Sequence, residues 1–239
     1  MDHPEPSLAV GDQRLVGRLR SVGPCTWLLG ALILLLVAYP MVGESPDWAL
    51  LMGVLNSAVL VSGAWAASRT RRTLILAFCF ALPALALQWL WVVGHDLDVG
   101  VLLIVTLMVF YTFAIGHLMI FVLRPGPVTG NKLHGAVSAF VMLGLLWAFL
   151  YKLFDVLTPG CFVDTVTQQP QRALQWGDFV FFSFTTLSTT GYGDIVPLSG
   201  HAQSATILEQ LAGILYVAVL IARLAGLYQP RLSSHAHEP

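Results

Sequence analysis

Charged residues are scarce in this sequence. Lys, Arg, Asp and Glu together make up 10% of its 239 residues, against about 25% in an ordinary soluble domain. The formal net charge is -1, and no run of five or more like charges occurs, so no basic surface is available and nucleic acid is not an expected partner. With 56% hydrophobic residues, the composition predicts a membrane protein.

Cysteine is also rare. The three cysteines are too few and too scattered for a disulfide framework or a metal-ligand spacing, and no cofactor is expected. Cys25 and Cys79 lie in apolar stretches and are interpreted as packing residues. Cys161 lies in a polar loop, where it is either a free thiol or a cross-link between subunits.

Six apolar stretches approach the length of about 20 residues that a membrane-spanning helix needs. The N-terminus has acidic residues before its arginines and no small-residue cleavage site, so we expect no removable signal peptide. The fold class predicted is therefore an all-α membrane protein with six transmembrane helices. The expected spans are residues 25–41, 48–67, 73–93, 99–123, 133–157 and 203–228.

The cations gather in alternate connections. Arginine or lysine occurs before the first expected span, after the second, between the fourth and fifth and after the sixth. The positive-inside rule places these segments, and both termini, in the cytoplasm of a cell-membrane protein. The expected divisions are a cytoplasmic segment 1–24, a four-helix membrane domain 25–123, a pore-like domain 133–228 and a tail 229–239, which is too short for a soluble ligand-binding domain.

Between the last two expected spans lies a short apolar segment, residues 179–187, which cannot cross a bilayer. Such a segment suits a re-entrant half-helix buried within protein. We expect a helix from Asp178 to Ser188, with Asp178 as its N-cap. The carbonyl end of this helix would direct partial negative charge toward a central cavity.

The half-helix leads directly into Thr189-Thr190-Gly191-Tyr192-Gly193-Asp194. Main-chain carbonyls can replace the water around a cation without burying a full negative charge. Gly191 and Gly193 adopt the conformations that point successive carbonyls at one axis. We assign the ion-binding filter to residues 189–193, and the K⁺ ligands to the carbonyls of Thr189, Thr190, Gly191 and Tyr192. One strand cannot surround an ion, so four copies, a homotetramer, are expected in the bilayer.

An isolated Gly-Tyr-Gly would more simply be a surface turn. Here the preceding half-helix, the flanking spans and the membrane side favour a filter. The sequence resembles the potassium channel family over residues 133–228, and most sharply at Thr185-Thr186-Leu187-Ser188-Thr189-Thr190-Gly191-Tyr192-Gly193-Asp194.

The resemblance implies an outer helix, a pore helix, an extended selectivity filter and an inner helix in each quarter of a tetrameric pore. It further implies passive conduction of K⁺, the permeant ion, past the filter carbonyls. Gly213 stands where the family has its inner-helix hinge. Thr185 and Asp194, within and just after the motif, are expected to support the filter.

The sequence departs from the family at two places. The fourth expected span, 99–123, contains no arginine or lysine, so it cannot supply steep voltage gating. Phe181 and Phe182 stand where many members have tryptophans that hydrogen-bond around the filter. The support of the filter, and with it inactivation, is therefore left open.

Glu209 lies within the sixth expected span, where an ionised side chain is costly in lipid. It either hydrogen-bonds behind the filter and steadies the pore helix, or lies near the outer interface. Val217, Ile221 and Ala225 recur every four residues below Gly213, either lining the inner cavity or packing in the core.

Two other functions compete with a channel. A potassium transporter subunit uses filter-like loops, but typically four degenerate ones in one chain. A membrane-embedded enzyme would need converging catalytic groups, whereas His117, Glu209 and the outer-loop His95 lie on different segments. We expect no enzyme activity, and the gating stimulus is not disclosed by the sequence.

Overall fold

The computed structural model describes residues 23–39, 46–68, 70–94, 97–127, 129–166 and 173–227, without the side chains of 46–49 and 224–227. Long helices dominate this part of the chain, as expected from long apolar stretches that satisfy their own backbone hydrogen bonds. The helices are α2 (Pro24–Ala38), α3 (Pro46–Ala67), α4 (Arg71–Gly94), α5 (Leu97–Leu123), α6 (Gly130–Leu157), α7 (Trp176–Leu187) and α8 (Gly200–Leu227), with strands β1 (Phe162–Asp164) and β2 (Ile195–Pro197).

Five helices in the described part are long and apolar enough to cross a membrane, so the chain is a multi-pass membrane protein. They comprise Leu50–Ala67, Arg71–Gly94, Leu97–Leu123, Gly130–Leu157 and Gly200–Arg223. The first expected span, 25–41, corresponds to α2, which has 15 residues and at about 1.5 Å per residue is shorter than a bilayer core. Residues 40, 41 and 228 lie outside the described part, and the sixth crossing stays a prediction.

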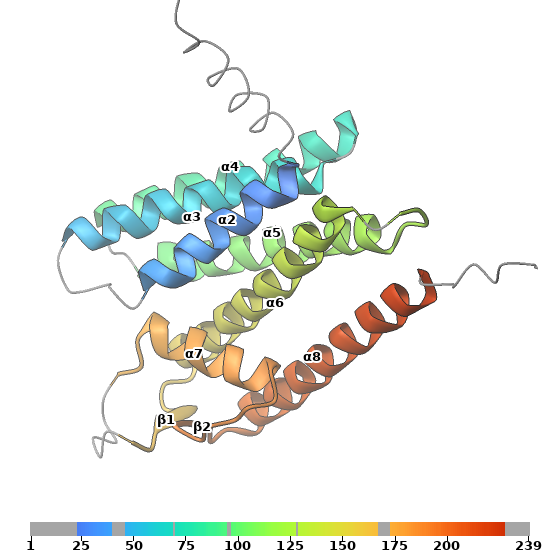
Figure 1. The fold of residues 1–239 in the computed structure, drawn as a ribbon. Coiled ribbons are helices and arrows are strands. Elements are labelled where there is room, and N and C mark those ends of the chain that lie inside the picture. The colour runs from blue at the N-terminus through green and yellow to red at the C-terminus, as the bar shows by residue number, and fades with distance from the viewer. Residues whose placement is uncertain are drawn as a thin grey trace, which may run out of the picture.

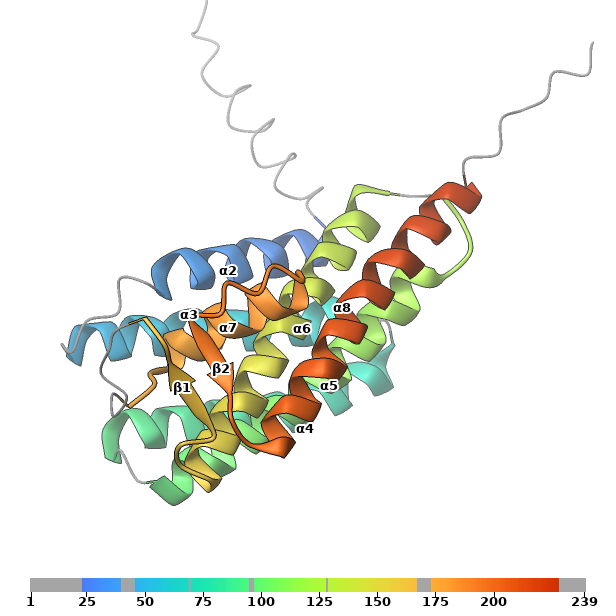
Figure 2. The same ribbon diagram turned by 90° about the horizontal axis from the view of Figure 1, so that it is seen from below.

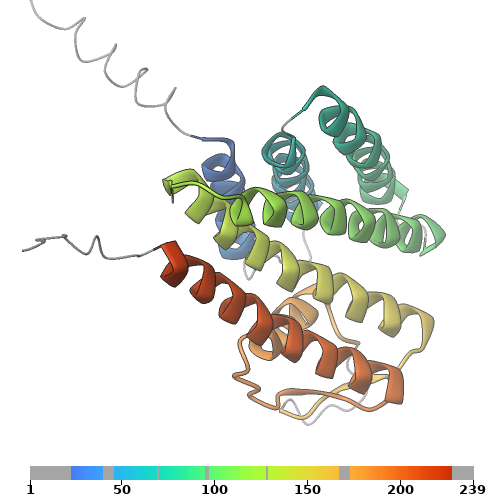
Figure 3. The ribbon, with the colours of Figure 1, turned by 90° about the vertical axis from the view of Figure 1, so that its right-hand side faces the viewer.

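Helix α6 separates two groups of helices. Helices α2 to α5 lie on one side of it, while α7 and α8 lie on the other (Figures 1 and 3). The interface between α5 and α6 is the most extensive in the molecule. The start of α2 and the end of α8 lie at the same end of the bundle (Figure 1).

Helix α7 is a short helix of 12 residues that lies between α6 and α8. It begins beside the last turns of α6, where Lys152 reaches the carbonyl of Leu174. It ends against the middle of α8, where the Leu187 carbonyl lies beside Gly213. The chain then returns through the filter to β2 and the start of α8. This path matches the half-helix expected from residues 179–187, although the helix begins earlier, at Trp176.

A small antiparallel sheet departs from the all-α prediction. Strand β1 pairs with β2, with Val163 opposite Val196, and both strands lie beside α7 (Figure 2). The Phe162 ring of β1 packs at 5.6 Å from that of Phe179 and 5.5 Å from that of Phe182 on α7. Strands of three residues are too short for a period-two pattern to stand out in a sequence.

Helix α2 is hydrogen-bonded to the re-entrant region at one end and to α6 at the other. The Tyr39 hydroxyl donates to the carbonyl of Gly177, in the first turn of α7, at 2.8 Å. Near the opposite end, Thr26 Oγ1 lies 2.7 Å from His134 Nδ1 on α6. Helix α2 therefore links the first turn of α7 to the beginning of α6.

All three cysteines are free in the structure. Cys161 lies directly before β1 with only 3% of its surface exposed, and its carbonyl accepts the Leu198 N–H at 2.8 Å. Burial, and secondarily the negative charge of Asp155, raises the pKa of the Cys161 thiol. A buried thiol with a raised pKa fits the free-thiol interpretation better than a cross-link between subunits.

Candidate functional site

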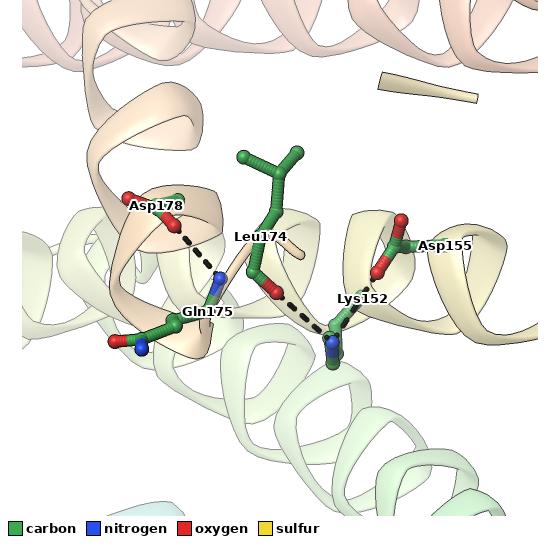
Figure 4. Close-up of polar contacts among 5 residues, drawn as sticks. All are labelled: Lys152, Asp155, Leu174, Gln175 and Asp178. Atoms are coloured by element: carbon green, nitrogen blue, oxygen red, sulfur yellow. Dashed lines mark hydrogen bonds and ion pairs between the residues drawn. The ribbon is translucent and has the colours of Figure 1, made fainter. Parts of the chain in front are cut away.

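The start of α7 is held by polar contacts around Lys152. The Lys152 ammonium lies 3.3 Å from the Asp155 carboxylate and 3.3 Å from the Leu174 carbonyl (Figure 4). Asp178 accepts the Gln175 N–H at 2.7 Å. Gln175, rather than Asp178, is the N-cap. The expected position was wrong because an acidic residue at the third helical position can reach back to the N-cap amide.

Hydrogen bonds to the end of α7 determine the direction of the carbonyl groups in the filter. The N–H groups of Thr190 and Gly191 both donate to the Thr185 carbonyl, at 2.8 and 3.1 Å, and the Thr189 N–H donates to Thr186 at 2.9 Å. In a trans peptide the carbonyl points opposite to the N–H that follows it. The carbonyls of Ser188, Thr189 and Thr190 are therefore directed away from the pore helix, toward the exposed side.

Left-handed backbone recurs at every second filter residue. Thr189 has φ of 59°, Gly191 of 55° and Gly193 of 81°. Glycine adopts these values freely, whereas a β-branched residue rarely does, so Thr189 is held there by its neighbours. The filter, expected as extended backbone, is neither helix nor strand between Thr190 and Tyr192. Such alternation turns successive peptide groups to one side of the chain.

Side chains of the filter lie back against α7. The Thr190 hydroxyl is 2.8 Å from that of Ser188, which donates to the Phe184 carbonyl at 2.7 Å. The Thr185 hydroxyl donates within its own helix, to Phe182, at 2.9 Å. The expected support from Thr185 therefore comes from its backbone carbonyl.

The outer end of the filter is bonded to the connection between α6 and α7. The Thr165 hydroxyl donates to the Gly193 carbonyl at 2.7 Å and lies 3.1 Å from the Asp194 carbonyl, which also accepts the Thr165 N–H at 2.8 Å. Gly193, the last residue of the expected filter, thus differs from the four before it, because its carbonyl already accepts a hydrogen bond from a hydroxyl.

Phe181 and Phe182 occupy different environments. Phe181 stacks on the Tyr192 ring, with centroids 5.9 Å apart and planes inclined by 8°. Phe182 is buried and packs at 5.0 Å from the Tyr151 ring. Neither side chain has a hydrogen-bond donor, so Phe181 contacts the filter through its ring, whereas Phe182 packs on Tyr151 and Phe162. A cleft behind the filter lies between these rings and Thr206 and Gln210 of α8.

The geometry agrees with what comparisons with known proteins found. Residues 138–229 match the family model described as "Ion channel". The chain is 29% identical over 86 residues to two-pore potassium channel 4 of Arabidopsis thaliana, covering 36% of this chain and 30% of that protein. It is 35% identical over 63 residues to the potassium channel protein kcv of Paramecium bursaria Chlorella virus 1, covering 26% of this chain and 63% of that protein.

The chain is thus similar to potassium channels over its C-terminal part. It spans less than two thirds of either relative's own length. No solved structure matches it significantly. The matched region contains most of α6, α7, residues 188–194 and α8, which are the elements of the site described above.

Glu209 joins three helices of this channel domain. Its carboxylate accepts the Ser183 hydroxyl of α7 and the Tyr151 hydroxyl of α6, each at 2.5 Å, and the residue is fully buried. The Ser183 hydroxyl also lies 2.7 Å from the Gly144 carbonyl. Buried polar groups are tolerated when hydrogen-bonded. Of the two sequence interpretations, the geometry favours a position behind the pore helix.

Gly213 is a point of close approach between α8 and α7. A Cβ atom placed there would lie 2.1 Å from the Leu187 carbonyl oxygen, well inside van der Waals contact. Glycine is therefore required by packing in this conformation. Its expected role as a hinge stays a prediction.

The lower part of α8 is open within one chain. Val217 and Ile221 are exposed, so neither packs in the core of its own subunit. The side chain of Ala225 lies outside the described part. Lining of the cavity by these residues stays a prediction.

The residues named for the enzyme alternative are placed only in part. His117 Nδ1 lies 3.0 Å from the Phe113 carbonyl of its own helix. No group of three or more His, Cys, Asp or Glu side chains that could hold a metal occurs among the described residues. His95 lies outside them.

Four contact residues of the site were missed by sequence reasoning, namely Tyr151, Ser183, Lys152 and Thr165. The hydroxyl residues and Lys152 lie on helices or loops without any motif. A serine within the apolar half-helix and a tyrosine within an apolar span were the available signals, because buried hydroxyls need partners, but neither identifies the partner.

We predict that Gly213→Ala destabilises the assembled channel, because α7 or α8 must shift to admit the methyl group. Overpacking of this kind costs about 1–3 kcal/mol per subunit. Thermal unfolding of the purified protein measures the loss. Gly116→Ala, on α5 with nothing within 4 Å of the added Cβ, is the control. An unfolding temperature for Gly213→Ala equal to that of the control would contradict the contact.

We predict that Glu209→Gln lowers single-channel open probability by about fivefold, the equivalent of one net hydrogen bond. Glutamine keeps one acceptor oxygen but presents a donor to the other hydroxyl. Tyr151→Phe should weaken the same network. The fold decrease in open probability of the double variant should therefore be smaller than the product of the two single decreases. Unchanged open probability in Glu209→Gln would leave the carboxylate with a purely structural role.

Proposed function

We propose that the chain is a subunit of a potassium-selective channel, in which four copies surround a central pore and K⁺ passes passively along the filter carbonyls. The observation that carries this proposal is the direction of the filter peptides. Their N–H groups are used by Thr185 and Thr186, which leaves the carbonyls of Thr189 and Thr190 facing away from the helix and available to a dehydrated cation.

A tetramer follows from the number of ligands. One chain supplies a single filter strand, whereas an ion that has lost its water must be surrounded on all sides. Two surfaces of the single chain are open where neighbouring subunits would pack. Residues 188–193 are exposed, and α8 is the least buried of the five candidate spans. The carbonyls of Thr189, Thr190, Gly191 and Tyr192 from each copy would form the rings of ligands.

The proposed location is the cell membrane with both termini in the cytoplasm. The start of α2 and the end of α8 lie at one end of the bundle, and Arg124, Lys132 and Arg223 lie near that end. The Arg124 carbonyl accepts from Lys132 at 2.9 Å and from Arg223 at 3.2 Å. Cationic residues collected at one end favour the cytoplasmic side.

We predict that the purified chain, reconstituted in planar bilayers between K⁺ and Na⁺ solutions, gives a reversal potential set by K⁺. Gly191→Ala should abolish this selectivity, because alanine resists φ of 55° by about 1 kcal/mol or more in each strand. Gly116→Ala is the matched control and should behave as wild type. A reversal potential near zero, or a monomer or dimer in solution, would refute the proposal.

We further predict weak voltage dependence. A charge moved through 100 mV gains about 2.3 kcal/mol, and α5, Leu97–Leu123, contains no arginine or lysine to move. Conductance should therefore change gradually with membrane potential. A tenfold rise within about 10 mV, which requires several gating charges, would show that another segment senses voltage.

A further inference from the structure

The two ends of the filter are held by different parts of the chain. The inner end is bonded to α7, through the amides of Thr189, Thr190 and Gly191. At the outer end, the residues of α7 beside the filter are Phe181 and Phe182, and phenylalanine has no hydrogen-bond donor. Contacts with α7 at this level are ring contacts, such as that between Phe181 and Tyr192.

Hydrogen bonds at the outer end come instead from Thr165. Its hydroxyl reaches the Gly193 carbonyl at 2.7 Å and its backbone N–H reaches the Asp194 carbonyl at 2.8 Å. The hydroxyl and the backbone N–H of Thr165 thus donate to two consecutive carbonyls, those of Gly193 and Asp194, at the outer end of the filter. Gly193 has φ of 81°, and glycine moves easily between backbone conformations. The orientation of this peptide therefore depends on a hydrogen bond from outside the filter.

Thr165 is itself firmly placed. It directly follows β1, and its bond to Asp194 extends the β1–β2 pairing by one residue. The other end of this ladder is the bond from the Leu198 N–H to the Cys161 carbonyl at 2.8 Å. Phe162 of β1 lies in an aromatic cluster, 5.3 Å from the Tyr151 ring of α6 and 5.5 Å from the Phe182 ring of α7.

We propose that Thr165 is the positioning residue for the outer end of the filter, and that the β1–β2 sheet links filter stability to the loop between α6 and α7. The sheet replaces donors that the pore helix lacks. Loss of the Thr165 hydroxyl releases the Gly193 peptide to rotate, and the outer end of the filter then collapses more readily when K⁺ is scarce. This inference rests on the proposed channel function.

The test compares Thr165→Val, which removes the hydroxyl at nearly constant shape, with Thr165→Ser, which retains it. Thr158→Val is the matched control, because Thr158 lies in the same loop and its hydrogen bonds are made by its backbone. Potassium currents are recorded during maintained opening at low and high external K⁺. We expect the current to decay about tenfold faster in Thr165→Val, with recovery at high external K⁺ and near wild-type decay in the serine and control variants.

A second measurement does not require conduction. Hydrogen–deuterium exchange of the peptide covering residues 193–197 should be faster in Thr165→Val than in Thr165→Ser at low K⁺. Equal decay and equal exchange in these two variants would overturn the role of Thr165 while leaving the channel intact. Faster exchange in a protein that passes no K⁺ would support the outer restraint and refute the channel function, so the two failures are distinguishable.

Discussion

The hydrogen bonds between the end of α7 and the filter amides are the constraint on which the rest of the site depends. Because Thr185 and Thr186 accept the amides of residues 189–191, the carbonyls on the other side of those peptides must face away from the helix. Contacts from α2, α6 and α8 hold α7 where these bonds can form.

Helix α7 is held from several directions. Lys152 binds the backbone just before it, Tyr39 of α2 donates to its first turn, and Glu209 of α8 accepts from Ser183 in its middle. Gly213 allows α8 to approach its last residue. A half-helix within a membrane protein has no hydrophobic drive toward one position among apolar neighbours, so packing and hydrogen bonds must specify it.

The first helices gain a structural role from this arrangement, although the charges of a voltage sensor are lacking in α5. Helix α2 packs on α6 and reaches the pore helix, while α5 forms the main interface with α6. Movement of these helices would be transmitted to α7 through Tyr39 and to α6 along its length. The fold therefore connects these helices mechanically to α6 and α7.

The sequence by itself determined the membrane class, five of the six expected spans and the short helix before residue 188, because hydropathy and helix length are local properties. The assignment of residues 189–193 as an ion filter stays a prediction. The tertiary structure alone decided what Glu209 and Gly213 contact and that Thr165 reaches Gly193 through a small sheet. Glu209 and Tyr151 are 58 residues apart, and Thr165 and Gly193 are 28 apart. Contacts at such separations depend on how whole helices pack, and no local pattern in the chain specifies that.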